Sequence, residues 1–478
     1  MPLLNRRQFM RHTLAAAGTV VISGTKSSGR VLGANDTIHV AVAGLNGRGG
    51  AHISAFSSLP NVRITYLIDP DARTFGPKVK AVEAKGGGTP KTVKDVRQAL
   101  DDKALDVISI ATPNHWHALM TIWACQAGKD VYVEKPCSHN VREGRIAVEA
   151  ARKYHRIVQH GTQSRSDGGW ARVAEVIKSG RYGKLLVARG LCYKLRRSIG
   201  TKEVTAPPAE LDFNLWLGPA AERPFHGNLV HYNWHWFWDF GNGDIGNQGV
   251  HQMDIARWMI PGNATLPKSV LSLGGRFGYS DQGETPNTQM AVFDFGETQL
   301  IFEVRGLPTE KYLGQAIGNV FHLEAGTIAG HQFYPKGSTK PEPLPAVEGP
   351  RRPGGNHFAN FLAAVRSRNP ADLNADILEG HYSSALGHLA NVSYRLGTLV
   401  PFNPRTKAFG DNQEAYETLA RLEEHLAKGN GLKLEGLQYR LGRKLVIDAK
   451  TETILGDAEA NRLLTRDYRA PFVVPERL

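Results

Sequence analysis

The stretch TIHVAVAGLNGRGGAHISAF, residues 37–56, combines a short apolar strand, a glycine-rich turn and the beginning of a helix. Residues 38–43 are apolar with β-branched members, a pattern typical of a strand buried on both faces. Glycines permit the tight turn that follows, and a helix is predicted from about Gly50. This order of elements is the setting in which a dinucleotide pyrophosphate binds, because the turn presents backbone N–H groups to the phosphates.

The glycine pattern departs from G-x-G-x-x-G at its second position. The stretch gives Gly44, Asn46 and Gly49, with Gly47 added. A second apolar strand, residues 62–68, ends in Asp69, which stands 25 residues after Gly44. A carboxylate there can bind the adenosine ribose hydroxyls and repels a 2′-phosphate. The sequence therefore predicts NAD as the cofactor, with NADP less favoured.

Strands and helices continue to alternate after this unit. They are expected at residues 106–111 (strand), 118–127 (helix) and 131–133 (strand). Such alternation predicts a parallel, doubly wound α/β sheet, in which ligands bind beyond the carboxyl ends of the strands. Gly44, Asp69, Thr112 and Glu134 all follow predicted strands, so we expect them to meet at one edge of a Rossmann domain over residues 36–160.

The segment VYVEKPCSHN, residues 131–140, places charge at the end of a buried strand. Pro136 ends the strand because it lacks the N–H that a ladder needs. A lysine that exchanges protons near neutral pH needs its pKa lowered by burial or by a nearby cation. Lys135 is therefore a candidate for proton transfer beside the cofactor, and the alternative is a structural ion pair with Glu134.

The segment HYNWHWFWDF, residues 231–240, is dense in aromatic residues. Trp234, Trp236 and Trp238 alternate with a period of two, which predicts an extended strand with the three indoles on one face. That face either packs on the core or offers an apolar surface to the C–H face of a sugar ring.

The segment GNGDIGNQGVHQMDIARWM, residues 241–259, predicts a helix over residues 247–259. Asn247, His251 and Asp254 then share one face, because they are spaced i, i+4 and i+7. Imidazole is the usual general acid and base near neutral pH, which makes His251 a candidate catalytic group. Two alternatives remain open: a histidine satisfied in the core, and a zinc site that gathers His231, His235, His251 and Asp254.

Composition sets the class of protein. The chain has 478 residues, 41% of them hydrophobic and 22% charged, as in soluble globular proteins of two or three domains. The net charge is +13 without any block of five or six Lys and Arg, which argues against nucleic acid as a partner. Its three cysteines, Cys125, Cys137 and Cys192, form neither a disulfide framework nor a CxxC motif.

The first 34 residues have the pattern of an export signal. They contain five basic residues and no acids, and removing those five charges from +13 leaves +8. Arg6 and Arg7 precede a modest apolar stretch, as in twin-arginine signals. We therefore expect a periplasmic or otherwise extracytoplasmic protein. No apolar run is long enough to span a bilayer, so no membrane association is expected of the mature form.

Together, AGLNGRGG, ATPNHWH, EKP and GNGDIGNQGVHQMDIARW resemble the Gfo/Idh/MocA family, which includes glucose–fructose oxidoreductase and inositol dehydrogenase. The resemblance covers roughly residues 36–400. It implies an N-terminal Rossmann domain and a C-terminal α/β domain, residues 161–410, with a large, open, mostly antiparallel sheet. Residues 411–478 are expected to pack back on the body, and the open sheet is expected to form a homo-oligomer.

The resemblance also implies roles for individual residues. Lys135 and His251 become catalytic, and substrate contacts are expected from Asp254, Asn247, Asp244 and Trp236. Cofactor contacts are expected from Gly44, Asn46, Gly47, Arg48, Gly49, Asp69, Thr112, Pro113, Asn114, His117, Glu134 and Lys135. Many dehydrogenases of the family carry Asp four residues before the histidine, where this chain has Asn247, and Asp244 is a candidate replacement.

The function implied is an exported NAD-dependent oxidoreductase that acts on a sugar, glycoside or cyclitol and keeps its nicotinamide cofactor tightly bound. An exported enzyme meets no obvious pool of free NAD, so the cofactor would be recycled within the site. An alternative is an NAD-dependent glycoside hydrolase that oxidises the sugar transiently and eliminates the aglycone. A sugar-binding protein with a vestigial cofactor site is a third possibility, against which Lys135 and His251 argue together.

Overall fold

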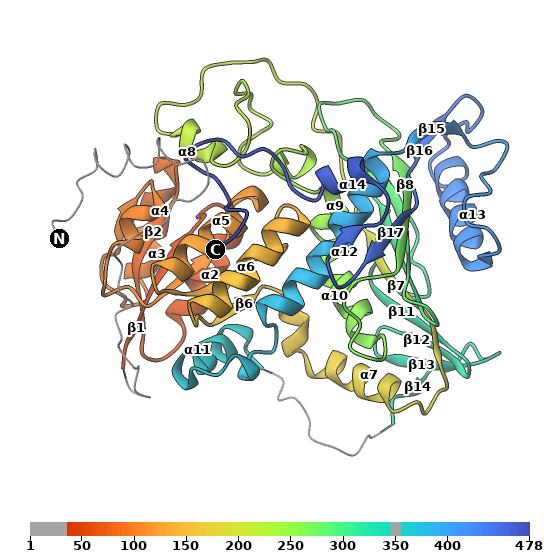
Figure 1. Ribbon diagram of the computed structural model, residues 1–478, viewed down its shortest axis with the longest axis horizontal. Coiled ribbons are helices and arrows are strands. Elements are labelled where there is room, and N and C mark those ends of the chain that lie inside the picture. The colour runs from red at the N-terminus through yellow and green to blue at the C-terminus, as the bar shows by residue number, and fades with distance from the viewer. Residues whose placement is uncertain (1–35, 346–354) are drawn as a thin grey trace.

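The computed structural model describes residues 36–345 and 355–478. The predicted export signal at residues 1–34 lies outside this part of the chain. Two α/β domains lie side by side, with the long helix α12 (Ile377–Arg395) between them (Figure 1). The predicted fold class is confirmed, because a parallel Rossmann sheet is followed by a larger, mostly antiparallel sheet.

The N-terminal domain is built on a six-stranded parallel sheet with the order β3-β2-β1-β4-β5-β6. Its strands are β1 (Ile38–Ala43), β2 (Val62–Ile68), β3 (Lys91–Val93), β4 (Val107–Ile110), β5 (Asp130–Val133) and β6 (Val158–His160). Its helices are α2 (Arg48–Ser57), α3 (Phe75–Glu83), α4 (Val96–Leu100), α5 (Asn114–Gln126) and α6 (Val141–Lys153). Every residue of β4 and β5 is buried, as apolar strands covered by helices on both faces require.

The C-terminal domain contains a 12-stranded sheet, whose main path runs β14-β13-β12-β11-β7-β10-β9-β8-β16-β15. Its strands are β7 (Leu185–Tyr193), β8 (Ser269–Gly275), β9 (Thr288–Asp294), β10 (Gln299–Arg305), β11 (Ile317–Leu323), β12 (Gly326–Ala329), β13 (Gln332–Pro335), β14 (Glu342–Pro343), β15 (Thr398–Pro401), β16 (Gln438–Leu441), β17 (Leu445–Asp448) and β18 (Thr453–Ile454). The helices that follow the Rossmann domain in the chain are α7 (Gly168–Lys178), α8 (Phe213–Leu217), α9 (Gly243–Gly246), α10 (Gly249–Met259), α11 (His357–Ser367), α12, α13 (Gln413–Ala427) and α14 (Ala458–Arg462). Of these, α11 packs on the Rossmann domain, where its Phe361 and Val365 join the core around Val40 of β1.

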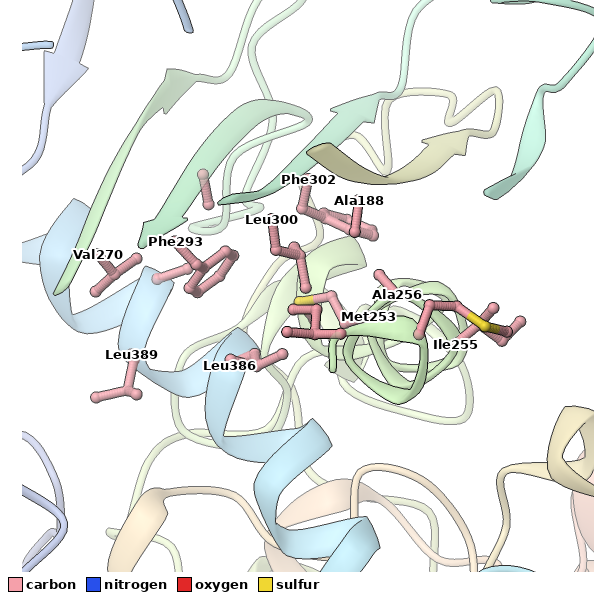
Figure 2. Close-up of a cluster of buried hydrophobic side chains, with 14 of the residues drawn as sticks. Ala188, Met253, Ile255, Ala256, Val270, Phe293, Leu300, Phe302, Leu386 and Leu389 are labelled. Carbon is pink, nitrogen blue, oxygen red and sulfur yellow. The ribbon is translucent and has the colours of Figure 1, made fainter. Parts of the chain in front are cut away.

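One apolar core fixes helix α10 against this sheet. Figure 2 shows Met253 and Ala256 of α10 beside Leu300 and Phe302 of β10, with α12 supplying Leu386 on the other side. Each fully buried side chain of this size contributes roughly 1.5–3 kcal/mol relative to an exposed one. Because α10 also carries His251, the core fixes the position of that imidazole.

The structure corrects one predicted element and shortens another. Residues 231–240 do not form a strand, and the chain turns through a 3₁₀ helix at Asn233–Trp236. The turn is held locally, since the Trp234 indole N–H donates to the His231 carbonyl oxygen at 3.1 Å. The helix predicted over residues 247–259 is α10, which ends at Met259 as predicted but begins two residues later, at Gly249. Asn247 therefore precedes the helix, in the break that separates α10 from the short helix α9.

Residues 411–478 contact both domains. Helix α13 lies on the outer face of the large sheet, where its Leu419 and Leu422 join an apolar cluster with Leu273 of β8. Near the C-terminus, Phe472 packs against Trp116 of the Rossmann domain, with ring centroids 5.4 Å apart. Within the described residues, none of the helices combines the length and apolarity needed to cross a bilayer.

Candidate active site

A cavity of about 380 Å³ opens at the carboxyl ends of β1, β2, β4 and β5, between the two domains. The Rossmann domain contributes Gly44, Leu45, Asn46, Gly47, Arg48, Ile68, Asp69, Pro70, Lys94, Asp95, Val96, Ala111, Thr112, Pro113, Asn114, Trp116, His117, Met120, Glu134 and Lys135 to its lining. The rest of the chain contributes Gln163, Lys194, Leu215, Trp216, His231, Tyr232, Trp234, His235, Asn247, Gln248 and His251. All the residues expected to bind the cofactor line this cavity, with the exception of Gly49.

Gly49 belongs to the turn without lining the cavity. A Cβ atom on it would lie 1.8 Å from the Gly44 carbonyl oxygen, so a larger residue cannot fit. Gly44 has φ +81°, and a Cβ there would come within 2.6 Å of the Ala111 backbone. The turn therefore needs glycine at both positions even though Asn46 replaces the middle one of the usual pattern. Gly47, with no atom within 4 Å of a Cβ built on it, lines the cavity and leaves room for a pyrophosphate to approach the backbone.

Asp69 is held where an adenosine ribose would lie. Its carboxylate accepts hydrogen bonds from the backbone N–H groups of Leu45 at 2.8 Å and Asp71 at 2.9 Å. Arg73, the cation that could have bound a 2′-phosphate, instead donates to Asp71 at 2.8 Å and is not part of the cavity lining. An acidic residue without a free arginine beside it favours NAD over NADP.

Glu134 anchors the other end of the cofactor region. Its carboxylate accepts hydrogen bonds from Arg48 at 2.7 Å and Gln163 at 3.2 Å, and the His52 imidazole lies 3.0 Å away. Burial alone would raise the pKa of this carboxyl group, but His52, Arg48 and the charge of Lys135 hold it well below its usual range. Glu134 is therefore an anion neutralised by its neighbours, and the Lys135 amine is left to other partners.

The amine of Lys135 points to the break between α9 and α10. Its Nζ donates to the Asn247 side-chain oxygen at 2.8 Å and to the Asn247 backbone carbonyl oxygen at 3.2 Å. That carbonyl is available because the chain leaves the helical conformation at Asn247, with φ −95° and ψ −94°. Burial lowers the pKa of Lys135 to about 8, and the charge of Glu134 opposes the shift. At neutral pH the amine can therefore exchange a proton without a large cost.

His251 lines the same cavity from the first turn of α10. Burial, followed by the nearby charge of Lys135, lowers the pKa of its imidazole to about 3. The ring is consequently neutral across the physiological range and can donate one hydrogen bond and accept another. The structure thus brings together Lys135, Asn247 and His251. Lys135 lies more than a hundred residues before Asn247 in the sequence, and Asn247 lies in the helix break just before the helix that carries His251.

Three residues expected to bind substrate lie outside the cavity lining. Asp254 is fully buried, and it accepts hydrogen bonds from Arg165 at 2.9 Å and Ser383 at 2.6 Å. Asp244 accepts two hydrogen bonds from Arg196, at 2.8 and 2.6 Å, so it supports that guanidinium and not the imidazole of His251. Trp236 packs under the same guanidinium, whose carbon lies 4.9 Å from the ring centroid.

Two further residues line the cavity: Trp234, which the sequence pattern did not distinguish from Trp236 and Trp238, and Lys194, which it did not indicate. Trp234, not Trp236, is the lining tryptophan of the aromatic segment, and its ring stacks on His235 at 3.6 Å between centroids. Lys194 enters directly after the end of β7. The period-two pattern could not single out Trp234, because the segment is not a strand.

His117 of the loop ATPNHWH is held by two backbone carbonyl groups. The two ring nitrogens of His117 face the carbonyl oxygens of Pro136, at 2.5 Å, and Thr112, at 2.8 Å, which joins two strand-end turns. Within residues 36–345 and 355–478, no group of three or more His, Cys, Asp or Glu side chains is arranged to hold a metal ion. The alternative zinc site is therefore not formed by the described residues.

Comparison with known proteins agrees with this architecture. Residues 38–162 match the model of the oxidoreductase family with an NAD-binding Rossmann fold, and residues 187–425 match that of its C-terminal alpha/beta domain. The chain belongs to the Gfo/Idh/MocA oxidoreductase family. Its predicted family and NAD cofactor are thus confirmed, and the residues around the glycine-rich turn and Asp69 fit NAD.

Among Gfo/Idh/MocA relatives, the chain is 27% identical over 206 residues to a glycosyl hydrolase family 109 protein of Shewanella pealeana, covering 38% of this chain and 44% of that protein. It is 30% identical to scyllo-inositol 2-dehydrogenase (NAD(+)) of Bacillus subtilis, covering 36% and 47%, and 25% identical to levoglucosan dehydrogenase of Pseudarthrobacter phenanthrenivorans, covering 55% and 64%. The chain thus spans less than two thirds of these relatives' length.

A solved structure shares the fold of this Gfo/Idh/MocA chain over most of its length. The WlbA dehydrogenase from Bordetella pertussis, in complex with NADH and UDP-GlcNAcA, superposes with a TM-score of 0.54 at 18% identity. The match covers 74% of this chain and 96% of that one. At such low identity the likeness concerns the fold alone.

Proposed function

We propose that the protein is an NAD-dependent oxidoreductase that acts on a carbinol group of a sugar, glycoside or cyclitol. The observation that carries this proposal is the meeting of Lys135, Asn247 and His251 at one end of a cavity whose other end fits NAD. Dehydrogenases for inositol and levoglucosan among the relatives agree with a polyhydroxylated substrate.

The pKa values divide the work between the two catalytic groups. When bound, NAD⁺ accepts the hydride that leaves the carbinol carbon. Lys135, with a pKa of about 8, takes the hydroxyl proton as the carbonyl forms, because a base is most effective when its pKa lies near the working pH. His251 stays neutral and orients the same hydroxyl by a hydrogen bond. In the reverse direction the Lys135 ammonium returns the proton.

We also propose that the cofactor stays bound through many turnovers. Residues 208–217, here called the strap, join the turn after β2 to α5 and contribute Leu215 and Trp216 to the cavity lining. Its Asp212 N–H donates to the Pro70 carbonyl oxygen at 2.9 Å, directly after Asp69. On its other side, Trp116 donates to the Leu215 carbonyl oxygen at 3.1 Å. A nucleotide beneath the strap could leave only after these contacts had opened.

Retention of the cofactor suits a protein outside the cytoplasm, and we propose export through the twin-arginine signal around Arg6 and Arg7. That pathway carries folded proteins, so the nucleotide could be loaded before export. Fusion of residues 1–40 to a reporter should give export that is lost when both arginines become lysine. A reporter retained in the cytoplasm in both cases would argue against the proposal.

The second candidate function is redox-neutral cleavage of a glycoside by transient oxidation and elimination. Two points support it: the contacts of the strap, which would retain the cofactor for the return of the hydride, and the similarity to glycosyl hydrolase family 109 proteins. Asn247 is compatible with both functions, because it holds Lys135 without adding charge.

A single experiment separates these functions. The purified protein is denatured to identify its nucleotide, and the intact protein is incubated with sugars, cyclitols and nitrophenyl glycosides. Reduction of the bound nicotinamide with formation of a ketone supports the oxidoreductase. Release of the aglycone without net reduction supports the hydrolase, and neither change with any substrate would contradict both proposals.

For its partners, we propose a carbohydrate substrate and a homo-oligomer formed through the large sheet. Helix α13 already covers the outer face at β8, so we place the contact on the part formed by β11–β14. Light scattering during gel filtration tests it: a mass near 52 kDa for the full chain would mean a monomer and would contradict this part of the proposal.

A further inference from the structure

The substrate end of the cavity carries two lysines, and one of them has no ion-pair partner among the described residues. Lys135 and Lys194 both line this end, and they lie close enough to each other that the charge of Lys194 helps to lower the pKa of Lys135. Lys194 is half-buried, and its side chain has no hydrogen bond or ion pair with any described residue. An amine held in a binding cavity without a partner is available to a ligand.

The carboxylates around this end are already occupied. Glu134 is bound by Arg48 and His52, and Asp244 is bound by both nitrogens of the Arg196 fork. The other lining carboxylates, Asp69 and Asp95, belong to the β2 and β3 ends, where the adenosine would lie. Gln163, Tyr232, His235, Gln248 and His251 also line the cavity, and none of them supplies a negative charge to Lys194.

We propose that the substrate carries a carboxylate, as a uronic acid or its glycoside does, and that Lys194 binds that group. The proposal rests on the function proposed above, because it names the substrate class of the same site. A carboxylate beside Lys194 would complete its hydrogen bonding by a charge-assisted contact. The same charge would keep the sugar in one orientation, with a hydroxyl at Lys135 and the carboxylate at Lys194.

Binding is measured by calorimetry on the protein with its bound nucleotide. The probes are methyl glycosides of glucuronic, galacturonic and mannuronic acid, each compared with its neutral hexose counterpart. At least one uronate should bind about tenfold or more tightly than its neutral partner, the gain typical of one charge-assisted hydrogen bond. The difference should shrink as salt rises, because ion pairs are screened. Equal binding of each pair, or no uronate binding at all, would overturn the proposal.

Variants assign the effect to Lys194. Lys194→Gln should abolish the preference for uronates over neutral glycosides without emptying the nucleotide site, and Lys194→Arg should keep that preference. Lys202→Gln is the matched control, because Lys202 is exposed and lies outside the cavity lining. If Lys194→Gln weakens neutral and acidic ligands equally, or empties the nucleotide site, Lys194 does not read the carboxylate.

Turnover is scored separately with the same ligands. If uronates are preferred in binding but neither reduce the bound nicotinamide nor lose an aglycone, the proposed chemistry fails and the assignment of Lys194 stands. If neutral sugars bind and react as well as uronates, the chemistry stands and the assignment of Lys194 fails.

Discussion

Asn247→Asp should shift the pH dependence of sugar oxidation to higher pH. The Asn247 side-chain oxygen lies 2.8 Å from the Lys135 Nζ atom, and both groups line the cavity. In the native protein this partner is neutral, and burial lowers the pKa of Lys135 to about 8 although the charges of Glu134 and Asp244 oppose the shift. Aspartate has nearly the same shape as asparagine but places a negative charge at that distance.

The size of the shift follows from the contact. An opposite charge within hydrogen-bond distance raises the pKa of a lysine by about 1–3 units, so a value near 10 is expected in the variant. With a pKa of about 8, roughly a quarter of Lys135 is neutral at pH 7.5, and with a pKa near 10 the neutral fraction falls roughly 75-fold. Because Lys135 must be neutral to accept the proton, oxidation at pH 7.5 should fall by a similar factor.

The assay is single-turnover reduction of the bound nicotinamide, followed by absorbance between pH 6 and pH 11. The native rate should rise to half its maximum near pH 8, and the variant rate should do so about two pH units higher. Asn247→Ala is the control, because it removes the acceptor without adding charge and should not raise the midpoint. A variant profile that superposes on the native one would refute the reasoning, as would a native rate that falls as pH rises through 8.

Three further outcomes are expected. Asp69→Ser should raise binding of NADP relative to NAD by about tenfold or more in nucleotide titrations of the stripped protein, because the carboxylate no longer repels the 2′-phosphate; an unchanged ratio would exclude this role. Asp254→Asn should lower the free energy of unfolding by about 3 kcal/mol, because Arg165 loses a buried charge partner, and it should leave KM nearly unchanged. A native melting temperature with a raised KM would instead favour substrate binding by Asp254. Gly49→Ala should abolish nucleotide retention, because the added Cβ atom would lie 1.8 Å from a carbonyl oxygen. Gly50→Ala should be tolerated, because its Cβ atom meets only the flexible end of Lys78, and equal nucleotide retention by the two variants would contradict the close packing of the turn.

Local pattern was sufficient for the Rossmann domain. The strands at 38–43 and 62–68 were predicted with the bounds observed for β1 and β2, because their apolar runs end at the turn residues that follow. The fate of Asp254 depended on Arg165, which lies 89 positions away and on another element. No periodicity within residues 247–259 carries that information, so a helix-face argument could place the carboxylate near His251 but could not identify its partner.

The prediction of a strand in the aromatic segment, residues 231–240, was wrong for a related reason. Alternation of Trp234, Trp236 and Trp238 predicts a strand only if the backbone seeks partners in a sheet. Here the backbone oxygens of His231 and Tyr232 are bound by side chains three residues later, which folds the segment on itself. The break at Asn247 was equally invisible, although Gly246 and Gly249 on either side of it are residues that favour such an interruption.

Replacement of the Lys135 amine tests the central claim most directly. Lys135→Met keeps the length and burial of the side chain and removes its proton, so the purified variant should hold the native amount of nucleotide. With the same sugar, the bound nicotinamide should be reduced at least a hundredfold more slowly in the variant than in the native protein. This factor is at the low end of what a positioned acid or base contributes. Reduction at the native rate by a variant that retains its nucleotide would contradict the assignment of Lys135 as the proton acceptor.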